Sequence, residues 1–364
     1  MKITVLTVFN PLFVTAASWL TLLALYVMQP VGVLYPSDGT GIFYIACIFL
    51  VAATISIIVG HKRVVHLETQ SAIYSSKGNF YAKLFFASAL LEILLKGLPP
   101  IFTGADYTSW GISGLHGFIN VLGLYVSYWY FSIFLIATDS KRLTALIVVI
   151  LVLLWQICVL NRAIMMLNLV GLMYIALSMK RLKMIHLIAA PIGMILLIGQ
   201  VGDMRGMGED YIFLITNPKP WAEEMGVGFV WVVTYFTTAI SNLMFNIEQG
   251  QVNGYSPMLF FNEFLPNIFK YEFINADIML YEGNFNASTI MRPSFLAFGL
   301  LGPVITFVIL VWLNILNFSR RKSFDWFIFT TFLASTSVFS CYENTIFTPW
   351  LIFMFLLSLN FRFR

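Results

Sequence analysis

Three arginines at the borders of apolar runs are the strongest candidates for chemistry in this 364-residue chain. Arg162 lies between two such runs, Arg205 follows one, and Arg292 precedes another. A guanidinium at hydrocarbon depth is costly without a partner, and its planar fork matches the oxygens of a phosphate. Snorkelling or pairing with a carboxylate explains a single such arginine equally well. The three together favour a function, with a polyanion such as a pyrophosphate as ligand.

The last two arginines border a polar, aromatic stretch from 202 to 292. It holds 10 of the 17 acidic residues and four of the 21 basic ones. Most of these acids are expected on a solvated face, but one of them could act as a general base toward a sugar hydroxyl. The nominated bases are Asp203, Glu223, Glu224 and Glu248. The stretch contains no DxD, no HExxH and no histidine pair, so no metal site and no cofactor are predicted.

Five further residues are candidate substrate-binding residues on the same side of the membrane: His116, Tyr235, Asn242, Asn286 and Tyr342. His116 belongs to the glycine-rich connection 110–117, where a lone histidine is more often structural. Glu92 and Lys96 lie four residues apart in one apolar run, and we expect them to pair on one helix face.

The composition indicates an integral membrane protein. The chain is 59% hydrophobic and 10% charged, with a mean hydropathy of +0.85, whereas a soluble domain carries roughly 25% charged residues. The apolar runs are unbroken and near twenty residues long, which is typical of membrane-spanning helices rather than barrel strands. The net charge of +4 reflects basic connections and does not indicate nucleic-acid binding. The three cysteines form no CxxC pair, and the first apolar run is too long for a cleaved signal peptide.

Ten spans are predicted, and the basic residues orient them. The spans cover 3–28, 42–60, 81–95, 118–137, 143–160, 163–179, 184–201, 294–316, 325–340 and 349–361. Alternate connections and the two termini hold 15 of the 21 basic residues, and that side is expected to be the cytoplasm. Both termini are therefore predicted to be cytoplasmic, and the 202–292 stretch exoplasmic.

The expected fold class is an all-α polytopic membrane protein in three parts. Spans one to seven occupy 1–201, a periplasmic loop region with active-site elements occupies 202–293, and spans eight to ten occupy 294–364. Within the loop, 229–247 is nearly uncharged, which predicts a helix that lies at the membrane interface or dips into the membrane.

Several short motifs occur in an order that resembles a known family. They are Asn10-Pro11, Gly97-Leu98-Pro99, the 110–117 segment, Gly202-Asp203-Met204-Arg205 and the 286–302 segment NASTIMRPSFLAFGLLG. Together with the topology, they resemble the oligosaccharide repeat-unit polymerases, the Wzy-type O-antigen polymerases. The resemblance covers nearly the whole chain, although each motif alone is weak. One departure is Ala297, where the family often has an acidic residue before Phe-Gly.

The resemblance implies a GT-C-like, metal-independent, inverting glycosyltransferase of the bacterial inner membrane. Such an enzyme transfers a glycan from undecaprenyl pyrophosphate to the non-reducing end of a new lipid-linked repeat unit. Arg205 and Arg292 match arginines of the family, and Arg162 matches an earlier one. The implied partners are undecaprenyl-pyrophosphate-linked glycans, membrane lipids and a chain-length regulator, with no nucleic acid.

Two other functions remain open from the sequence. An O-antigen ligase would share the fold and the donor, but it usually carries a histidine late in the exoplasmic loop. All four histidines here precede that loop. A lipid-linked oligosaccharide flippase or transporter should show repeated halves and cationic residues within its spans, and the sequence shows neither. The polymerase is the favoured function.

Overall fold

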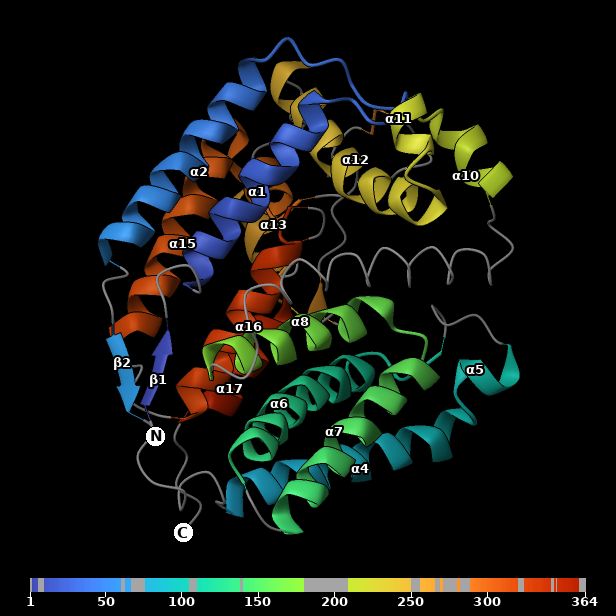
Figure 1. Ribbon diagram of the computed structural model, residues 1–364, viewed down its shortest axis with the longest axis vertical. Coiled ribbons are helices and arrows are strands. Elements are labelled where there is room, and N and C mark those ends of the chain that lie inside the picture. Colours follow the sequence, from blue (N-terminus) through green and yellow to red (C-terminus); the bar gives the residue numbers. More distant parts are fainter. Residues whose placement is uncertain are drawn as a thin grey trace.

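The computed structural model is nearly all helical (Figure 1). It describes residues 2–5, 10–59, 63–66, 76–104, 110–137, 140–179, 209–249, 256–265, 269–270, 280–281, 289–319, 324–341, 344 and 346–359. Its main helices are α1 (Pro11–Val27), α2 (Thr40–Val59), α4 (Ser76–Lys96), α6 (Leu115–Ile136), α7 (Ser140–Cys158), α8 (Arg162–Ser178), α12 (Val227–Gln249), α15 (Gly302–Ser319), α16 (Phe324–Phe339) and α17 (Pro349–Ser358). Shorter elements are α5 (Pro100–Thr103), α10 (Glu209–Thr216), α11 (Pro220–Glu223), α13 (Pro257–Asn262), α14 (Arg292–Phe298) and the 3₁₀ turn η3 (Gly299–Leu301).

The main helices form two groups joined by α16. Helices α1, α2 and α15 lie side by side in one group, and α4, α6 and α7 lie side by side in the other (Figure 1). Helix α16 packs against α1 on one side and against α8 and α6 on the other. The chain therefore brings its last helices into the middle of the molecule, between helices made much earlier.

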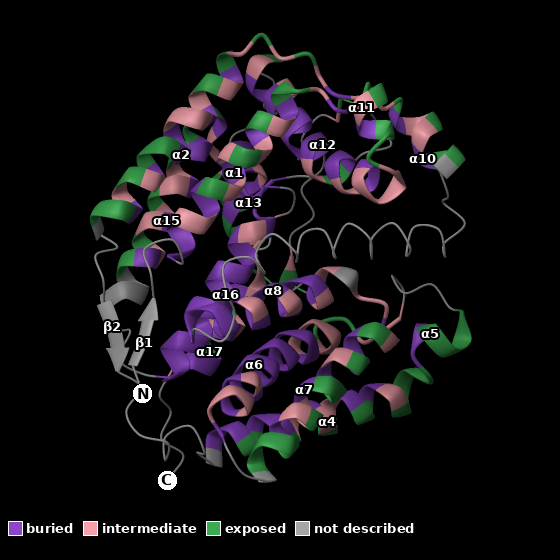
Figure 2. Cartoon of the chain, in the orientation of Figure 1, coloured by how far each residue is buried: buried purple, intermediate pink, exposed green. Residues whose placement is uncertain are grey.

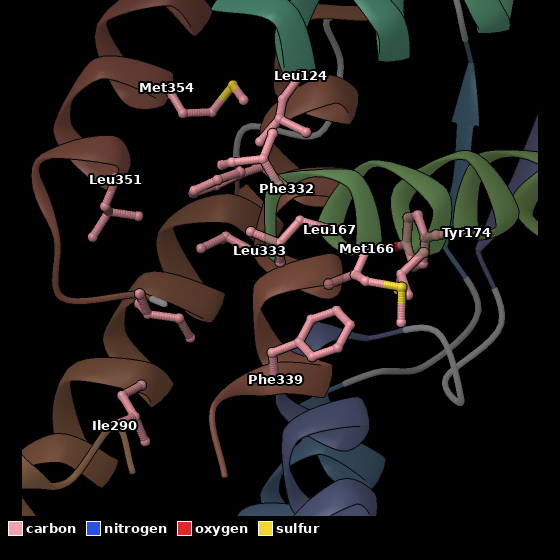
Figure 3. Packing of buried hydrophobic residues seen from close by; sticks show 14 of the residues in the cluster. Leu124, Met166, Leu167, Tyr174, Ile290, Phe332, Leu333, Phe339, Leu351 and Met354 are labelled. Atoms are coloured by element: carbon pink, nitrogen blue, oxygen red, sulfur yellow. The ribbon is translucent and has the colours of Figure 1, made fainter. Parts of the chain in front are cut away.

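Burial separates central helices from peripheral ones (Figure 2). In α6, 78% of the most apolar window is buried inside the protein, whereas the corresponding share in α7 is 28%. Figure 3 shows the packing around the central helices, where Leu124 of α6, Leu167 of α8 and Phe332 of α16 lie close to one another. The apolar outer faces of α2, α4 and α7 stay exposed, as expected for surfaces that meet lipid.

The lengths of the helices confirm the coarse prediction of a helical membrane protein. Six helices in the described part of the chain are long and apolar enough to cross a membrane, and four shorter apolar helices accompany them. The predicted seventh span, 184–201, lies outside the described residues. The full count of ten spans and the GT-C-like architecture stay predictions.

The predicted first span begins too early. The structure has strand β1 (Lys2–Val5) antiparallel to β2 (Arg63–His66), with Lys2 opposite His66. Both segments are rich in β-branched residues, which favour strands. The helix starts only at Pro11, because the Asn10 side chain accepts a hydrogen bond from the backbone N–H of Leu12 at 3.0 Å. Asparagine before proline is a strong helix start.

Helix α12 lies within what the sequence presented as a loop, and it is long and apolar enough to cross a membrane. Both of its flanks nevertheless bind the connection between α1 and α2. Lys219, eight residues before α12, donates to the Met28 carbonyl at 3.0 Å. Glu248, near the end of α12, accepts from the Gly41 backbone N–H at 3.2 Å. A crossing helix would have its flanks on opposite sides, so these contacts favour the predicted interfacial or dipping helix.

Polar side chains tie the first helix to the last ones. The Trp19 indole donates to the Ser340 hydroxyl at 3.1 Å, and Asn314 of α15 accepts from the Leu12 backbone N–H at 3.3 Å. Trp19 also stacks on Phe49 of α2, with ring centroids 4.7 Å apart. Hydrogen bonds of this kind satisfy polar groups that have no access to water in a membrane.

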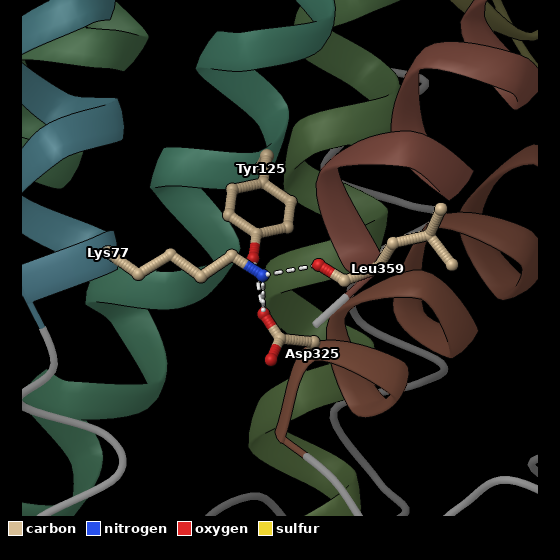
Figure 4. Close-up of polar contacts among 4 residues, drawn as sticks. All are labelled: Lys77, Tyr125, Asp325 and Leu359. Carbon is tan, nitrogen blue, oxygen red and sulfur yellow. Dashed lines mark hydrogen bonds and ion pairs between the residues drawn. The ribbon is translucent and has the colours of Figure 1, made fainter. Parts of the chain in front are cut away.

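A buried ion pair with its partners, the Lys77 cluster, links the starts of α4 and α16 and the end of α17 to the middle of α6 (Figure 4). Lys77 of α4 lies 2.6 Å from Asp325 of α16 and donates to the Leu359 carbonyl, just past α17, at 3.1 Å. The Tyr125 hydroxyl of α6 donates to the same Asp325 oxygen at 2.7 Å. We refer to these helix ends as the Lys77 end, which the charge pattern predicts to be cytoplasmic.

Candidate functional site

The opposite ends of α4, α6, α7 and α8 meet around Glu92, and we refer to this face as the Glu92 end. Glu92 lies one turn before the end of α4 and binds His116 in the first turn of α6. Trp110, just before α6, packs on Trp155 near the end of α7, with ring centroids 6.0 Å apart. Arg162, the first residue of α8, follows α7 after a short turn. Its backbone therefore belongs to the Glu92 end.

The other group of helices reaches the same end. Asp325 in the first turn of α16 belongs to the Lys77 end, so Ser340, just past the last turn of α16, lies at the Glu92 end. The Ile290 backbone N–H donates to the Ser340 carbonyl at 2.8 Å, which places Arg292, two residues later, nearby. Because α1 starts against the last turns of α15, its far end and the α1–α2 connection also lie at the Glu92 end.

Four of the predicted site residues lie outside the described residues: Asp203, Arg205, Asn286 and Tyr342. Arg162 has a described backbone, but its side chain lies outside the described part. Arg292 is the first residue of α14 and is half-buried, with its backbone N–H donating to the Thr289 carbonyl at 3.1 Å. The predicted clamp of three arginines therefore stays a prediction.

Glu248 binds the start of α2. Its carboxylate accepts from the Ser37 hydroxyl, from the Asp38 backbone N–H at 3.1 Å and from the Gly41 backbone N–H at 3.2 Å. A carboxylate at a helix N-terminus satisfies orphan N–H groups and complements the helix dipole. The neighbouring Asp38 carboxyl accepts from the Thr40 backbone N–H at 2.8 Å, which lowers the pKa of Asp38. Glu248 thus has a structural role in addition to its predicted one as a base.

Asn242 lies six residues before Glu248 on α12 and also binds a distant segment. It is buried, and its side-chain oxygen accepts from the Tyr281 backbone N–H at 3.1 Å. The Tyr281 ring packs against Tyr35 and Phe245, at centroid distances of 5.3 and 5.6 Å. The structure therefore brings Asn242 and Glu248 to the same neighbourhood, beside the α1–α2 connection.

The remaining loop candidates are exposed. Tyr235 stacks on Trp231, one turn earlier in α12, with centroids 5.6 Å apart and the rings within 22° of parallel. Glu223 ends α11, and Glu224 follows it; both side chains are exposed. No ion pair of either glutamate is present in the described part of the chain. Their predicted role as bases stays a prediction.

His116 binds Glu92, and the predicted pairing of Glu92 with Lys96 is wrong. The fully buried Glu92 carboxylate lies 3.0 Å from Nδ1 of His116 and accepts from the Ile112 backbone N–H at 2.9 Å. Lys96 is exposed at the end of α4. A buried carboxylate gains more from partners that share its burial than from a lysine that reaches water.

Sequence reasoning missed the polar residues beside this pair. Gln156 of α7 accepts from Asn168 of α8 at 3.0 Å, and both are buried. Trp155, next to Gln156, packs on Trp110, whose ring is also perpendicular to that of His116 at 5.7 Å. The available signal was the presence of Gln156 and Asn168 within apolar runs, where polar residues are costly. Their meeting depends on contacts between helices, which no local spacing reveals.

Comparison with protein-family models, with curated proteins and with solved structures gave no match for this chain.

Proposed function

We propose that this chain polymerises lipid-linked oligosaccharide repeat units, in the manner of the Wzy-type polymerases that its motifs resemble. The donor glycan is carried on undecaprenyl pyrophosphate, the acceptor is a second lipid-linked unit, and the configuration at the donor carbon inverts. The reaction takes place at the periplasmic face of the bacterial inner membrane. Polysaccharides such as O-antigen are products of this reaction class.

One observation carries the proposal. The residues concerned come from distant parts of the sequence, and the directions of their helices place them on the same side of the bundle, the Glu92 end: His116, Asn242, Glu248, Arg292 and the backbone of Arg162. Lys77 and Arg142, two of the basic residues that the charge pattern assigns to the cytoplasm, belong to the opposite end. A transferase acting on lipid-linked glycans outside the cytoplasm needs this separation.

Transfer from a pyrophosphate donor requires few kinds of catalytic group. A pyrophosphate is already a good leaving group, so little acid catalysis is needed on that side. Positive charge aimed at the developing pyrophosphate supplies most of the electrostatic stabilisation of the transition state. A base must then take the proton of the acceptor hydroxyl.

Gene deletion with complementation tests the proposal. Without a polymerase, cells should attach single repeat units to the lipid A core, and the wild-type gene should restore a ladder of long chains. Loss of a ligase would instead leave the core bare while lipid-linked polymer accumulates. Loss of a flippase would leave no repeat units at the periplasmic face. Either of these last two profiles would contradict the proposed polymerase.

Arginine variants sharpen this test. Arg205→Lys and Arg292→Lys keep the charge but lose the bidentate fork. A charge-assisted hydrogen bond contributes about 1.5–3 kcal/mol, so polymer made per protein molecule should fall about ten- to a hundredfold. Arg142→Lys is the matched control, because Arg142 lies at the other end of α7, over the Phe134 ring at 4.9 Å. Normal ladders from both clamp variants would contradict the proposed clamp.

A further inference from the structure

His116 is held in one orientation by a buried carboxylate. Glu92 is fully buried, whereas the His116 side chain is 22% exposed. Opposite an ionised Glu92, which can only accept hydrogen bonds, Nδ1 of His116 is the nitrogen that carries the hydrogen. In the neutral ring, Nε2 is then the nitrogen with a free lone pair. This is the arrangement in which a carboxylate orients an imidazole and stabilises its protonated form.

Residues of the 110–117 segment pack against the His116 ring. Gly111 has a φ of +106°, a conformation that residues with side chains rarely adopt, and a Cβ there would meet Cγ of His116 at 2.9 Å. Trp110 packs edge-on against the ring. Nε2 of His116 has no hydrogen-bond partner among the residues that the structure describes. The connection thus fixes the ring and leaves its second nitrogen available.

Unsatisfied polar atoms gather beside this ring. Buried side-chain atoms without a hydrogen-bond partner in the described part of the chain include Nε1 of Trp110, Nε1 of Trp155, Nε2 of Gln156, Oδ1 of Asn168 and Oδ1 of Asn120. Trp110 contacts both His116 and Trp155, Gln156 binds Asn168, and Asn120 lies one turn after His116 on α6. Native proteins leave few such atoms unpaired, so the surroundings of His116 are polar as well as buried.

We propose that His116 is the catalytic base of the polymerase and that Glu92 is its positioning residue. This inference rests on the proposed function and identifies the base that it requires. Nε2 of His116 takes the proton from a hydroxyl at the non-reducing end of the acceptor unit.

The step balances as follows. The acceptor oxygen, losing its proton to Nε2, forms a bond to the anomeric carbon of the donor glycan. The bond between that carbon and undecaprenyl pyrophosphate breaks, and the pyrophosphate leaves with the electron pair. Glu92 stabilises the imidazolium until it releases the proton to water, which restores the neutral ring. No oxidant, reductant or metal takes part in this sequence.

The loop carboxylates fit this role less well. Glu248 already accepts three hydrogen bonds at the start of α2, which occupy its carboxylate with a structural contact. Glu223 and Glu224 are exposed, and no described residue forms an ion pair that would orient either one. His116 alone among the described candidates combines a fixed orientation, an available lone pair and unpaired polar neighbours.

Complementation of a deletion strain with single variants is the primary test. His116→Gln and His116→Ala should lower polymer per protein molecule at least a hundredfold, since a general base contributes about 10²- to 10⁴-fold. Glu92→Gln should lower it less, because the amide still accepts from Ile112 but no longer stabilises the imidazolium. Imidazole in the medium should restore part of the activity of His116→Ala and none of that of Glu92→Gln. His66→Gln, in β2 at the Lys77 end, is the matched control.

The outcomes separate the two proposals. If the wild-type gene restores no ladder, the proposed function fails and the inference fails with it. If the wild type restores the ladder and His116→Gln does so equally at equal protein level, only the inference fails. Rescue that rises with the basicity of substituted imidazoles of similar size excludes a purely structural histidine, because refilling the cavity does not depend on the basicity of the ring.

A second measurement covers the case in which the His116 variants do not accumulate. A chain with His61, His66 and His186 changed to Gln keeps His116 as its one histidine. Treating membranes of that strain with diethyl pyrocarbonate should stop chain extension, and hydroxylamine should restore it. Mass spectrometry should locate the modification on His116. Undiminished extension by a fully modified protein would overturn the proposal.

Discussion

Two buried carboxylates lie at opposite ends of α4: Glu92 on the helix itself and Asp325 against its start. They differ in how fully their basic partners are hydrogen-bonded. Lys77 and Glu92 are fifteen residues apart on α4, or about 22 Å along its axis. Asp325 binds Lys77 and Tyr125, and Lys77 has a second acceptor in the Leu359 carbonyl. Glu92 also binds a basic partner, yet Nε2 of that partner, His116, is without a described hydrogen-bond partner.

The difference separates a structural pair from the pair to which we assign a catalytic role. In the Lys77 cluster both charged partners are multiply bound, which is what burial of an ion pair requires if it is not to destabilise the fold. At the Glu92 end, polar groups are buried and left unsatisfied, which costs stability unless a ligand binds them. The Lys77 cluster therefore connects helices, whereas Nε2 of His116 at the Glu92 end has no described partner and could accept a proton.

The largest expected effect comes from breaking the Lys77 cluster. Asp325→Ala leaves a buried ammonium without its carboxylate, which should cost about 3–5 kcal/mol of stability. Membrane protein level and melting temperature in detergent should both fall sharply. The double variant Lys77→Met, Asp325→Leu is the control, since replacing both charges with apolar groups should recover much of the loss. If Asp325→Ala melted at the wild-type temperature, the Lys77 cluster would not stabilise the fold, and the proposed contrast with the Glu92 end would be contradicted.

Glu248 provides an intermediate case, because it is a saturated carboxylate at the end where chemistry is proposed. Glu248→Ala removes three hydrogen bonds at the start of α2, and we expect a loss of about 1.5–3 kcal/mol of stability. Ser37→Ala removes one of these donors and should lower the melting temperature by less. If Glu248→Ala instead accumulates normally and makes no polymer, Glu248 is the base and His116 is not.

The smallest expected effect tests how much the second hydrogen-bond partner of Asp325, Tyr125, contributes to stability. Tyr125→Phe deletes one neutral donor and should lower the free energy of unfolding by about 0.5–1.5 kcal/mol. Tyr81→Phe is the matched control, because its ring lies 5.9 Å from the Lys77 ammonium and that contact survives loss of the hydroxyl. Equal melting temperatures for the two variants would show that the Tyr125 hydrogen bond adds nothing.

The sequence predicted the helices well where the signal was local. Apolar runs are visible within one window, and most predicted spans that fall on described residues coincide with helices to within a few residues at each end. The first span failed at its start, because 3–5 is as apolar as the helix that follows and only pairing with β2 distinguishes it. Helix α12 was visible as an uncharged segment, but its contacts with α1 and α2 were not.

The candidate site was less predictable, because it consists of contacts between distant residues. Glu92 was paired with Lys96 on the basis of helical spacing, whereas its partner, His116, lies 24 residues away. The Lys77–Asp325 pair spans 248 positions and has no local signature. Gln156 and Asn168 were each visible as polar residues among apolar ones, but only the antiparallel packing of α7 and α8 brings them together.

The hydrogen bond from Trp19 to Ser340 has a consequence for how the protein is made. The two residues are 321 positions apart, which corresponds to about 15–65 seconds of synthesis at roughly 5–20 residues per second. Asn314, the other late partner of α1, emerges shortly before Ser340. Helix α1 therefore waits in the bilayer with its indole N–H unmatched until α16 has followed. Synthesis of α15 and α16, rather than insertion of the α1–α2 hairpin, completes the polar contacts of α1.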